Sequence, residues 1–405
     1  MPKPLEGVRV LELTTYVAAP CCGRLLSDLG ADVIKIERAS GDAWRGTGKS
    51  YNALFNDDAN PVFDIYNSGK RCIDLNLKTP EGLEVFHKLL ADTDVFITNT
   101  RPKALKRLGI SYEDLKDRYP GLIYAIVLGY GEEGPDKDLP AFDTTAFWSS
   151  SGFLRDQAMK TDCYMPVNPP SSAGDTVTCL LLLSEVCAAL VNKQRTGKGD
   201  YVRSGLYHNG IFTMGTMEII AQKPWGRKYP QTRIEAGVPG GMYCCADGEW
   251  IYIAFAYAPT YLKPLCAAID QPELAEDPRF ATVKSRSENR EAIYQIFRDA
   301  FLSQPCSHWL AKAKEFDLPM VRMKQYQDVT TDEQAWVNGY LEEVTFRNGM
   351  TATMPRSPIN MDSVGPLKTQ CAPHIGADTE AVLQWLGYTE ADIEAIKQAG
   401  AISAR

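Results

Sequence analysis

The sequence predicts an α/β fold that is built on a parallel sheet of the Rossmann type. Short apolar and β-branched segments alternate with helical patterns from residue 8 to residue 128. Parallel strands need such helical crossovers, so this alternation is typical of a sheet covered by helices. The chain has 405 residues, 44% of them hydrophobic, a length that suits about two or three domains. We therefore expect a first α/β domain at residues 1–200 and a smaller one after it.

Each expected element rests on its hydrophobic period and on the turn residues that bound it. The helix that starts at residue 21 ends at Gly30, and the long helix that starts at residue 175 ends before the turn 196–200. The predicted strands are 8–13, 32–37, 95–98 and 122–128, and the predicted helices are 21–29, 81–90, 175–193 and 201–222.

The second half of the chain begins with a change of composition. Residues 223–241 are rich in Gly, Pro and Arg, and a turn at 244–248 precedes a strand at 250–255. Helical patterns follow at 260–269, 290–302 and 307–316, then short strands at 343–346 and 352–354 and final helices at 378–386 and 389–399. We expect a linker helix at 201–225, a small α+β domain at 226–325, a returning linker at 326–370 and C-terminal helices at 371–405.

Charge and cysteine usage exclude several classes of protein. A net charge of −8 and a pI near 5.3 argue against a general binder of nucleic acid or anionic membranes. No apolar leader is visible, and the longest apolar run, 179–191, is shorter than the ~20 residues of a membrane span. We therefore expect a cytoplasmic protein with free thiols. The adjacent pairs Cys21–Cys22 and Cys244–Cys245 lack metal-ligand spacing, so no metal site is expected.

The opening strand, loop and helix have the layout of a dinucleotide-binding unit, with Glu37 at the end of the second strand. The loop 15–23 lacks the Gly-x-Gly-x-x-Gly pattern, which argues against NAD. Basic residues gather near strand ends or turns, where such sheets bind ligands. They form either a solvated positive face or a site for a phosphorylated ligand. These basic residues are Lys70, Arg71, Arg101, Lys103, Lys106 and Arg107.

Gly174 and Asp175 stand at the start of a long apolar helix. An Asp in this position is most often a helix cap. The alternative is a nucleophile, because first-turn amides and the helix dipole favour an ionised carboxylate. Gly174 would then let a substrate approach the backbone. The residues alone leave both interpretations open.

Six short motifs in a specific order resemble the class III CoA-transferases, the group that contains formyl-CoA:oxalate and carnitine CoA-transferases. The likeness extends over nearly the whole chain. Residues 16–20 and 129–140 are most similar to the phenyllactate and 2-hydroxyisocaproate enzymes of amino-acid-fermenting anaerobes. The six motifs lie at residues 30–37 (Gly-Ala-Asp-Val-Ile-Lys-Ile-Glu), 75–82, 129–131, 173–175, 196–199 and 376–379.

The resemblance implies a mechanism and a set of site residues. Asp175 matches the family's catalytic aspartate, which attacks an acyl-CoA to form a mixed anhydride and then an aspartyl-CoA thioester. Backbone amides near Val17 and Ala18 are candidate oxyanion donors. CoA enters as a substrate, with no permanently bound cofactor and no metal. The implied CoA contacts are Arg38, Lys70, Arg71, Asn99, Arg101 and Arg107.

The resemblance also implies an architecture and a substrate class. The C-terminal helices would complete a large Rossmann-like domain at 1–200, and two chains would interlock as a homodimer. An enoyl-CoA would donate CoA to an (R)-2-hydroxy acid during fermentation. A glycine-rich active-site lid would correspond to residues 237–241. Residues that flank the segments reaching Asp175 are the expected acyl pocket: Phe147, Trp148, Ser149, Ser150, Ser151 and Met165.

Three other functions remain to be weighed. An α-methylacyl-CoA racemase has the same fold but needs a His where this chain has Phe142, and Phe cannot transfer a proton. A cysteine acyltransferase would need a His partner, and none is evident near the cysteines. A non-catalytic CoA-binding protein would have no need of Asp175 in its intact motif. A transferase is therefore preferred.

Overall fold

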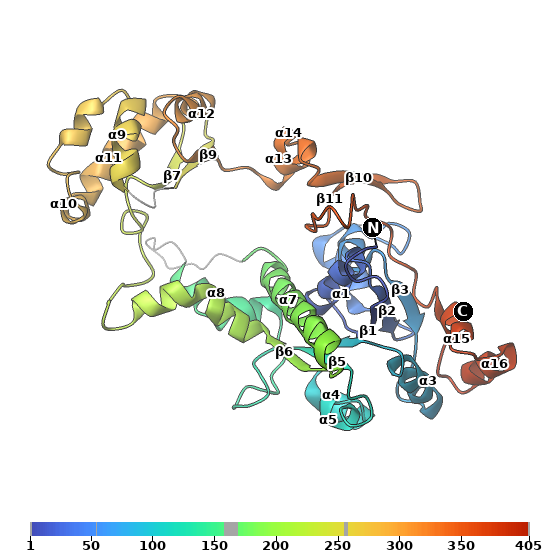
Figure 1. Cartoon of the computed structure of the whole chain (residues 1–405). Coiled ribbons are helices and arrows are strands. Elements are labelled where there is room, and N and C mark those ends of the chain that lie inside the picture. Colours follow the sequence, from blue (N-terminus) through green and yellow to red (C-terminus); the bar gives the residue numbers. More distant parts are fainter. Residues whose placement is uncertain (1, 54, 158–168, 255–257, 404–405) are drawn as a thin grey trace. The chain divides into compact units, whose positions relative to one another are not determined.

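The computed structural model describes residues 2–53, 55–157, 169–254 and 258–403. The chain divides into two compact units (Figure 1). The first comprises Met1–Gly152, Pro169–Glu218 and Asp332–Arg405, and the second comprises Phe153–Asn168 and Ile219–Thr331.

A six-stranded parallel sheet forms the centre of the first unit, which confirms the predicted fold class. The strand order β3-β2-β1-β4-β5-β6 is that of a Rossmann fold, with the order reversing between β1 and β4. Ligands of such sheets bind at this reversal, outside the carboxyl ends of the strands. The strands are β1 (Arg9–Leu13), β2 (Asp32–Glu37), β3 (Arg71–Asp74), β4 (Val95–Thr98), β5 (Ile123–Leu128) and β6 (Tyr201–Gly205).

The structure corrects the prediction of one helix over 201–222. Tyr201–Gly205 is the edge strand β6, paired in parallel with β5, and helix α8 (Leu206–Ala221) begins only after it. Val202 and Ser204 are buried in this strand. The β propensity of Tyr201 and Val202 was outweighed in the prediction by the longer helical pattern that follows them.

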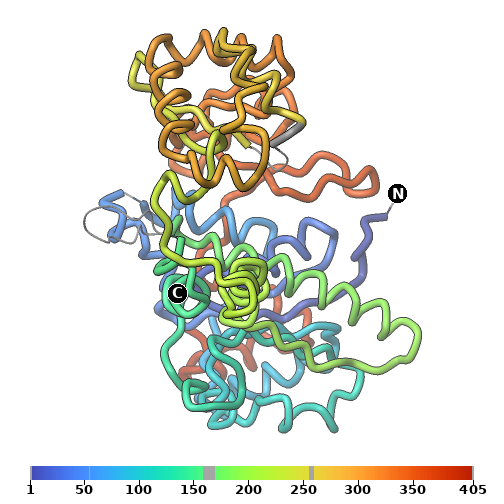
Figure 2. Tube along the Cα trace, turned by 90° about the vertical axis from the view of Figure 1, so that its left-hand side faces the viewer, coloured from blue at the N-terminus to red at the C-terminus, as the bar shows by residue number. Residues whose placement is uncertain are grey.

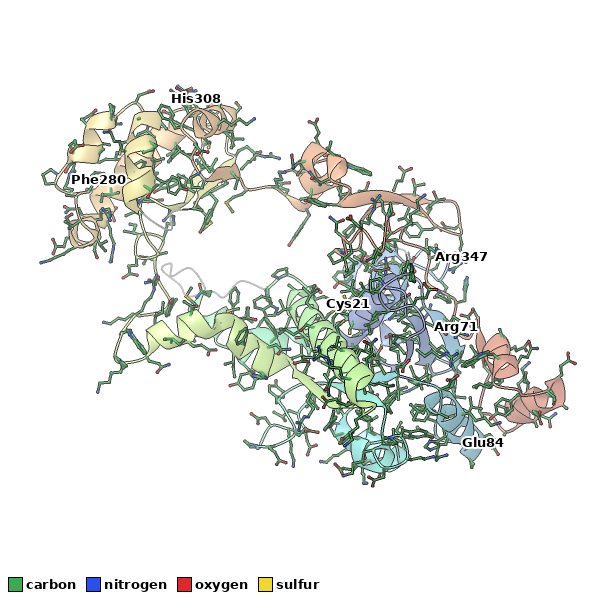
Figure 3. The ribbon with its side chains drawn as sticks, in the orientation of Figure 1. Cys21, Arg71, Glu84, Phe280, His308 and Arg347 are labelled. Atoms are coloured by element: carbon green, nitrogen blue, oxygen red, sulfur yellow. The ribbon has the colours of Figure 1, made fainter. Side chains whose placement is uncertain are left out.

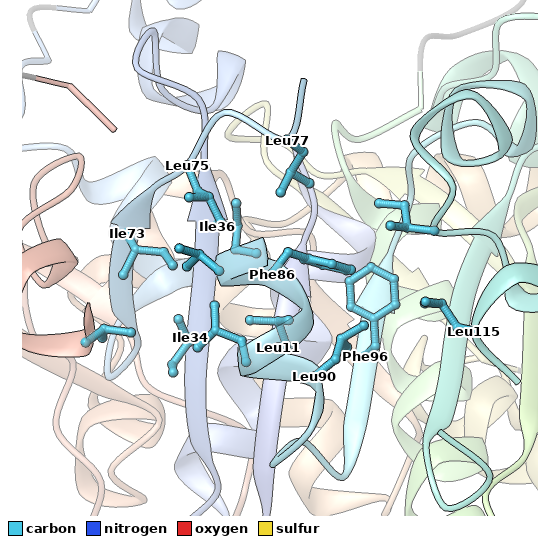
Figure 4. Close-up of a cluster of buried hydrophobic side chains, with 14 of the residues drawn as sticks. Leu11, Ile34, Ile36, Ile73, Leu75, Leu77, Phe86, Leu90, Phe96 and Leu115 are labelled. Atoms are coloured by element: carbon cyan, nitrogen blue, oxygen red, sulfur yellow. The ribbon is translucent and has the colours of Figure 1, made fainter. Parts of the chain in front are cut away.

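Helices cover both faces of the sheet, so the strands are apolar on both sides. Alternate residues of one strand enter different cores, as Val10 and Leu11 do in β1. One core contains Phe86 and Phe96 (Figure 4) and lies under α3 (Pro80–Leu90), α4 (Pro102–Leu108), α5 (Tyr112–Leu115), α15 (Thr379–Trp385) and α16 (Glu390–Gln398). The other lies under α1 (Ala18–Asp28) and α7 (Ala173–Thr196).

Helix α7 is, within the described part of the chain, the one helix long and apolar enough to cross a membrane by length and composition. Its residues Cys179, Leu182 and Val186 belong to the core shared with α1 and the sheet. One face of α7 (green in Figure 2) therefore packs in the first unit, while Leu180 and Val191 of the same helix are exposed.

The C-terminal segment attaches to the outer strand β3. Asp378 accepts the Cys72 N–H at 2.7 Å and donates its own N–H to the Cys72 carbonyl at 2.9 Å. The Thr379 hydroxyl donates to Asp74 at 3.0 Å. These bonds place α15 beside a strand more than three hundred positions earlier in the chain.

Smaller elements surround the sheet and build the second unit. The first unit also contains α2 (Pro61–Asn67), the 3₁₀ helix η1 (Ala43–Tyr51), α14 (Glu333–Val337) and the hairpin β10 (Leu341–Thr345) and β11 (Thr351–Pro355). The second contains the antiparallel sheet β7 (Gly241–Cys244), β8 (Trp250–Ile253) and β9 (Met320–Arg322), with α9 (Ala258–Ala268), α10 (Val283–Glu288), α11 (Arg290–Leu302), α12 (Cys306–Glu315) and α13 (Tyr326–Thr330).

A buried ion cluster joins β1, β2 and the start of β3 beneath α1. The Glu12 carboxylate contacts Lys70 at 2.8 Å and Lys35 at 3.0 Å, and all three side chains are at most 1% exposed. Burial disfavours the ionised form of Glu12, but the two ammonium groups outweigh it and keep its pKa below the ordinary value. Gly23 of α1 lies directly over the cluster, because a Cβ there would meet Glu12 Oε2 at 2.0 Å.

Replacing Gly23 by Ala should therefore destabilise the protein although Ala is the better helix former. We expect Gly23→Ala to lower the free energy of unfolding by about 2 kcal/mol or more, because it displaces a buried ion pair. Gly46 in η1 is the control, since it is exposed and its Cβ would meet nothing within 4 Å. Gly46→Ala should raise the free energy of unfolding by ~0.5–1 kcal/mol. Urea unfolding measures both, and a neutral Gly23→Ala would contradict the packing.

Candidate active site

A cleft of about 460 Å³ opens in the first unit where the strand order reverses. Its walls are the segments that leave β1, β4, β5 and β6, together with the start of α7. This is the edge at which open parallel sheets bind ligands. The lining residues include Thr15, Tyr16, Val17, Ala18, Trp44, Asn99, Arg101, Lys137, Phe142, Asp143, Ser171, Ser172 and Asp175.

Asp175 lies in the first turn of α7 and lines this cleft. Burial, and after it the negative charge of Asp143, raises its pKa from 3.8 to about 7. The carboxylate is therefore partly protonated at neutral pH, and its ionised form is poorly stabilised. Such a group suits attack on an electrophile better than a role as a helix cap.

The cap of α7 is supplied by Asp143, from the short helical segment Asp143–Ser149. Its carboxylate accepts the Asp175 N–H at 2.8 Å and the Trp148 indole N–H at 3.1 Å. Burial raises the pKa of Asp143, while hydrogen bonds from the amides of Asp175 and Gly174 and from Trp148 oppose that rise. The sequence analysis had not identified this residue. The sequence offers one signal for Asp143: this residue directly follows Phe142, which stands where a racemase has its catalytic His.

The packing of the protein itself requires a glycine at position 174. A Cβ at this position would meet Asp143 Oδ1 at 2.4 Å and the Phe147 ring at 2.5 Å. The close approach that requires glycine is thus made by the protein itself, and not by a substrate as expected from the sequence.

Val17 and Ala18 lie together at the start of α1 and line the cleft, and their role as oxyanion donors stays a prediction. Val17 is the N-cap residue, and its apolar side chain cannot cap the helix. The first N–H groups of a helix have no partner within it. Two helix N-termini therefore border the same cleft, one capped by Asp143 and one without a capping side chain of its own.

The predicted CoA contacts fall into two groups. Asn99 and Arg101 line the cleft. The Asn99 side chain also bonds the Thr15 backbone, accepting from its N–H at 3.0 Å and donating to its carbonyl at 2.7 Å. Arg38 and Arg107 are exposed residues beyond β2 and in the last turn of α4, outside the lining of the cleft.

Lys70 and Arg71 have partners elsewhere. The Lys70 ammonium is buried against Glu12 and donates to the Pro20 carbonyl at 2.8 Å, and burial lowers its pKa to about 8. Arg71 (Figure 3) pairs with Asp32 and lies over the Trp385 ring. A phosphate could reach the Lys70 side chain only if the buried ion cluster opened.

The aromatic wall of the cleft differs from the predicted acyl pocket. Tyr16 makes edge contacts with Phe142, at 5.4 Å between ring centroids, and with Trp44, at 6.2 Å. All three line the cleft. Phe147 and Trp148 do not: they are buried, and the Trp148 indole supports Asp143. Of the other predicted pocket residues, Ser149 and Ser150 are exposed, Ser151 is buried against Phe147, and Met165 lies outside the described residues.

Two further expectations concern other parts of the chain. Residues 238–240 form a bend that leads into β7 of the second unit, and Arg233 donates to the carbonyls of Gly237 at 3.1 Å and Gly240 at 2.8 Å. Their role as a lid stays a prediction. Over the described ranges no histidine lines the cleft and no cluster of His, Cys, Asp and Glu is suited to a metal ion.

Comparisons with known proteins agree with this geometry. Residues 5–379 match the model of CoA-transferase family III. The chain is 38% identical to (R)-2-hydroxy-4-methylpentanoate CoA-transferase of Clostridioides difficile, over 97% of this chain and 98% of the relative. It is 33% identical to cinnamoyl-CoA:phenyllactate CoA-transferase of Clostridium sporogenes, over 97% of this chain and 96% of the relative. A CAIB/BAIF family protein from Brucella suis has a similar structure, with a TM-score of 0.80, 27% identity and 95% and 100% coverage.

A Rossmann-like sheet, an aspartate in the cleft at its reversal point and similarity over nearly the full length lead to one assignment. The chain belongs to CoA-transferase family III and is a class III CoA-transferase.

Proposed function

We propose that this enzyme moves CoA from an enoyl-CoA to a free (R)-2-hydroxy acid, with Asp175 as the covalent nucleophile. The position of Asp175 carries the proposal: a carboxylate with a raised pKa lies in a cleft bordered by two helix N-termini. The names of two relatives support the substrate class, since one acts on (R)-2-hydroxy-4-methylpentanoate and the other on phenyllactate.

The reaction is a sequence of exchanges at three carbonyl carbons, those of the donor, of Asp175 and of the acceptor. The Asp175 carboxylate attacks the thioester carbonyl of the donor, and the C–S bond breaks to give a mixed anhydride and CoA thiolate. The thiolate attacks the Asp175 carbonyl carbon, which releases the donor acid and leaves an aspartyl-CoA thioester. The acceptor carboxylate repeats these two steps in reverse, so that CoA leaves on the acceptor and Asp175 is regenerated. No net proton transfer is needed.

Each attack places negative charge on a carbonyl oxygen, and this charge needs fixed donors. The amides at Val17 and Ala18 are the proposed donors, because the uncapped first turn of α1 borders the cleft that contains Asp175. The α7 amides are less available, since they bond Asp143. We place the two helix ends in different roles: α1 binds the oxyanion, and α7 with Asp143 orients the nucleophile.

The CoA phosphates and adenine are proposed to bind on the basic side of the cleft mouth. Arg101 and Lys137 line the cleft and carry positive charge. Arg38 and Arg107 are exposed cations, suited to a ligand that extends beyond the cleft. Asn99 is proposed to contact CoA from its place beside Arg101. For Lys70 and Arg71 we propose contacts through the backbone, because their side chains are already engaged.

We also propose an interlocked homodimer in the cytoplasm. Helix α8 presents apolar side chains to solvent, among them Phe212 at 77% exposed and Ile219 at 50%. Such a surface suits burial against a second copy. A reducing compartment suits Cys21 (Figure 3) and Cys179, which lie as free thiols in the packed core between α1 and α7.

Mass spectrometry can detect the covalent intermediate. Incubation with cinnamoyl-CoA should add the mass of CoA less one water to the protein, on the peptide that contains Asp175. Asp175→Asn should give no adduct and lower kcat by roughly 1,000-fold or more, because an amide cannot form the anhydride. Asp156→Asn serves as the control for handling and should form the adduct. An adduct on another residue would contradict the assignment.

A panel of acceptor acids tests the substrate class. With one enoyl-CoA donor, (R)-2-hydroxy-4-methylpentanoate and (R)-phenyllactate should have kcat/KM values at least about tenfold above 4-methylpentanoate, which lacks the hydroxyl, and above oxalate. The apolar aromatic wall of Tyr16, Trp44 and Phe142 gives the reason for poor use of oxalate. Preference for oxalate, or indifference to the hydroxyl group, would overturn this part of the proposal.

The pH profile should report the ionisation of Asp175. Because only the ionised carboxylate attacks, kcat/KM should fall as pH drops below about 7. Asp143→Asn keeps an acceptor for the Asp175 N–H but removes the neighbouring charge, so the midpoint should move to lower pH. Glu113→Gln, an exposed carboxylate on α5, should leave the midpoint unchanged. A shift to higher pH in Asp143→Asn would contradict the electrostatic argument.

A further inference from the structure

The loop between β1 and α1 contains a residue in an unusual conformation. Tyr16 has φ +67°, in the left-handed region that residues other than glycine rarely adopt. It stands directly before Val17 and Ala18, so its dihedral angles set how the chain enters the first turn of α1. Non-glycine residues in this region persist where the surrounding structure holds them, and they are concentrated at functional sites.

A single buried carboxylate holds this turn. Asp42 Oδ1 accepts the Tyr16 N–H at 3.1 Å and the Trp44 N–H at 3.0 Å. The same oxygen therefore connects two of the three aromatic residues that line the cleft. Asp42 Oδ2 forms an ion pair with Lys35 at 3.1 Å, and the Asp42 side chain is fully buried. Asp42 itself is not among the residues that line the cleft.

The partners of Asp42 are fixed as well. Lys35 Nζ also contacts Glu12 at 3.0 Å and donates to the Thr14 carbonyl at 3.0 Å. Burial alone would lower the pKa of Lys35, but the carboxylates of Glu12 and Asp42 outweigh it and keep the pKa above the ordinary value. Three consecutive residues, Thr14 to Tyr16, are thus held in turn by Lys35, Asn99 and Asp42.

We propose that Asp42 is a positioning residue for CoA transfer. Its carboxylate, anchored by Lys35, keeps Tyr16 in the left-handed conformation, and this sets both the Val17–Ala18 amides and the aromatic wall formed by Tyr16 and Trp44. Asp42 therefore acts on the chemical step and on the choice of acyl group, through the loop and without touching substrate. The inference rests on the proposed role of the cleft in acyl transfer from Asp175.

The geometry predicts a specific kinetic pattern. Loss of the carboxylate should lower kcat, because oxyanion donors at the start of α1 shift. KM for the CoA thioester should change less than threefold, because the proposed phosphate contacts at Arg101 and Arg107 lie after β4, on a different segment from Asp42. The preference for (R)-phenyllactate over a small acid such as acetate should weaken, because Tyr16 and Trp44 lose a common support.

A double-mutant cycle between positions 42 and 16 tests this pattern. Asp42→Ala should lower kcat about 10- to 100-fold, and Asp42→Asn, which retains an oxygen acceptor for both amides, should recover most of that loss. In Tyr16→Gly the left-handed turn needs no support, so adding Asp42→Ala should cost less than threefold. Additive losses at the two positions, a kcat equal to wild type in Asp42→Ala, or an effect on KM alone would overturn the proposal.

The matched control is Asp332→Ala, since Asp332 is also an N-cap aspartate of the first unit and accepts the Gln334 N–H. It should keep the wild-type kcat and acid preference.

Thermal melting shows whether each variant is folded. If Asp42→Ala does not fold, a pair at position 16 decides: Tyr16→Asn tolerates the left-handed turn and Tyr16→Val resists it, so the Val variant should have at least a tenfold lower kcat. Equal kcat values in this pair would refute the proposal.

The outcome is separable from that of the proposed function. Wild-type enzyme that forms no Asp175 adduct and transfers no CoA would refute the proposed function, whatever the Asp42 variants do. Wild-type enzyme that forms the adduct, beside an Asp42→Ala variant with the same kcat and acid preference, would refute only the positioning role.

Discussion

The N–H groups in the first turn of α7 lie near two carboxylates, Asp143 and Asp175, and the chemistry of the cleft depends on which of the two they stabilise. Asp143 takes the amide of Asp175 and fixes the helix end, so that Asp175 remains in a partly buried position with few groups to stabilise its charge. A helix N-terminus ordinarily lowers the pKa of a nearby acid. Here the N–H groups of the first turn bond Asp143 instead, and the pKa of Asp175 is raised to about 7.

The sequence was sufficient for four of the six strands and for the position of Asp175 at a helix start, because both leave local signals. Apolar strands bounded by turn residues predict β1, β2, β4 and β5, and Asp175 stands in a short motif at a helix start. The supporting residues leave no such signal. Asp143 reaches Asp175 across 32 positions and Lys70 reaches Glu12 across 58, so only the folded chain identifies these pairs. Residues 201–205 likewise form a strand because they pair with β5, although their sequence pattern predicted the start of a helix.

The buried charges change the interpretation of the basic residues. An acidic chain with cations near strand ends suggested a phosphate site, yet one of these cations, Lys70, neutralises a carboxylate inside the fold. Lys35 pairs with Glu12 and Asp42, and Lys70 pairs with Glu12. The segment 32–37, which contributed to the family resemblance, therefore has a physical reason for its Lys: the Lys35 side chain connects β1, β2 and the loop between β1 and α1. Arg101 and Lys137, by contrast, line the cleft, and these are the cations that the proposed CoA site would use.

The bonds between Asp378, Thr379 and β3 have a consequence for synthesis of the protein. The outer strand of the sheet and one of its two apolar faces are completed by residues near the end of the chain, including Val382 and Ile393. During translation, Phe86 and its neighbours stay uncovered until the ribosome has passed residues 378–396, about three hundred positions later. A chain that terminates before these residues keeps an exposed apolar surface and an incompletely bonded outer strand, and both features favour aggregation. Burial of this core therefore comes late in synthesis.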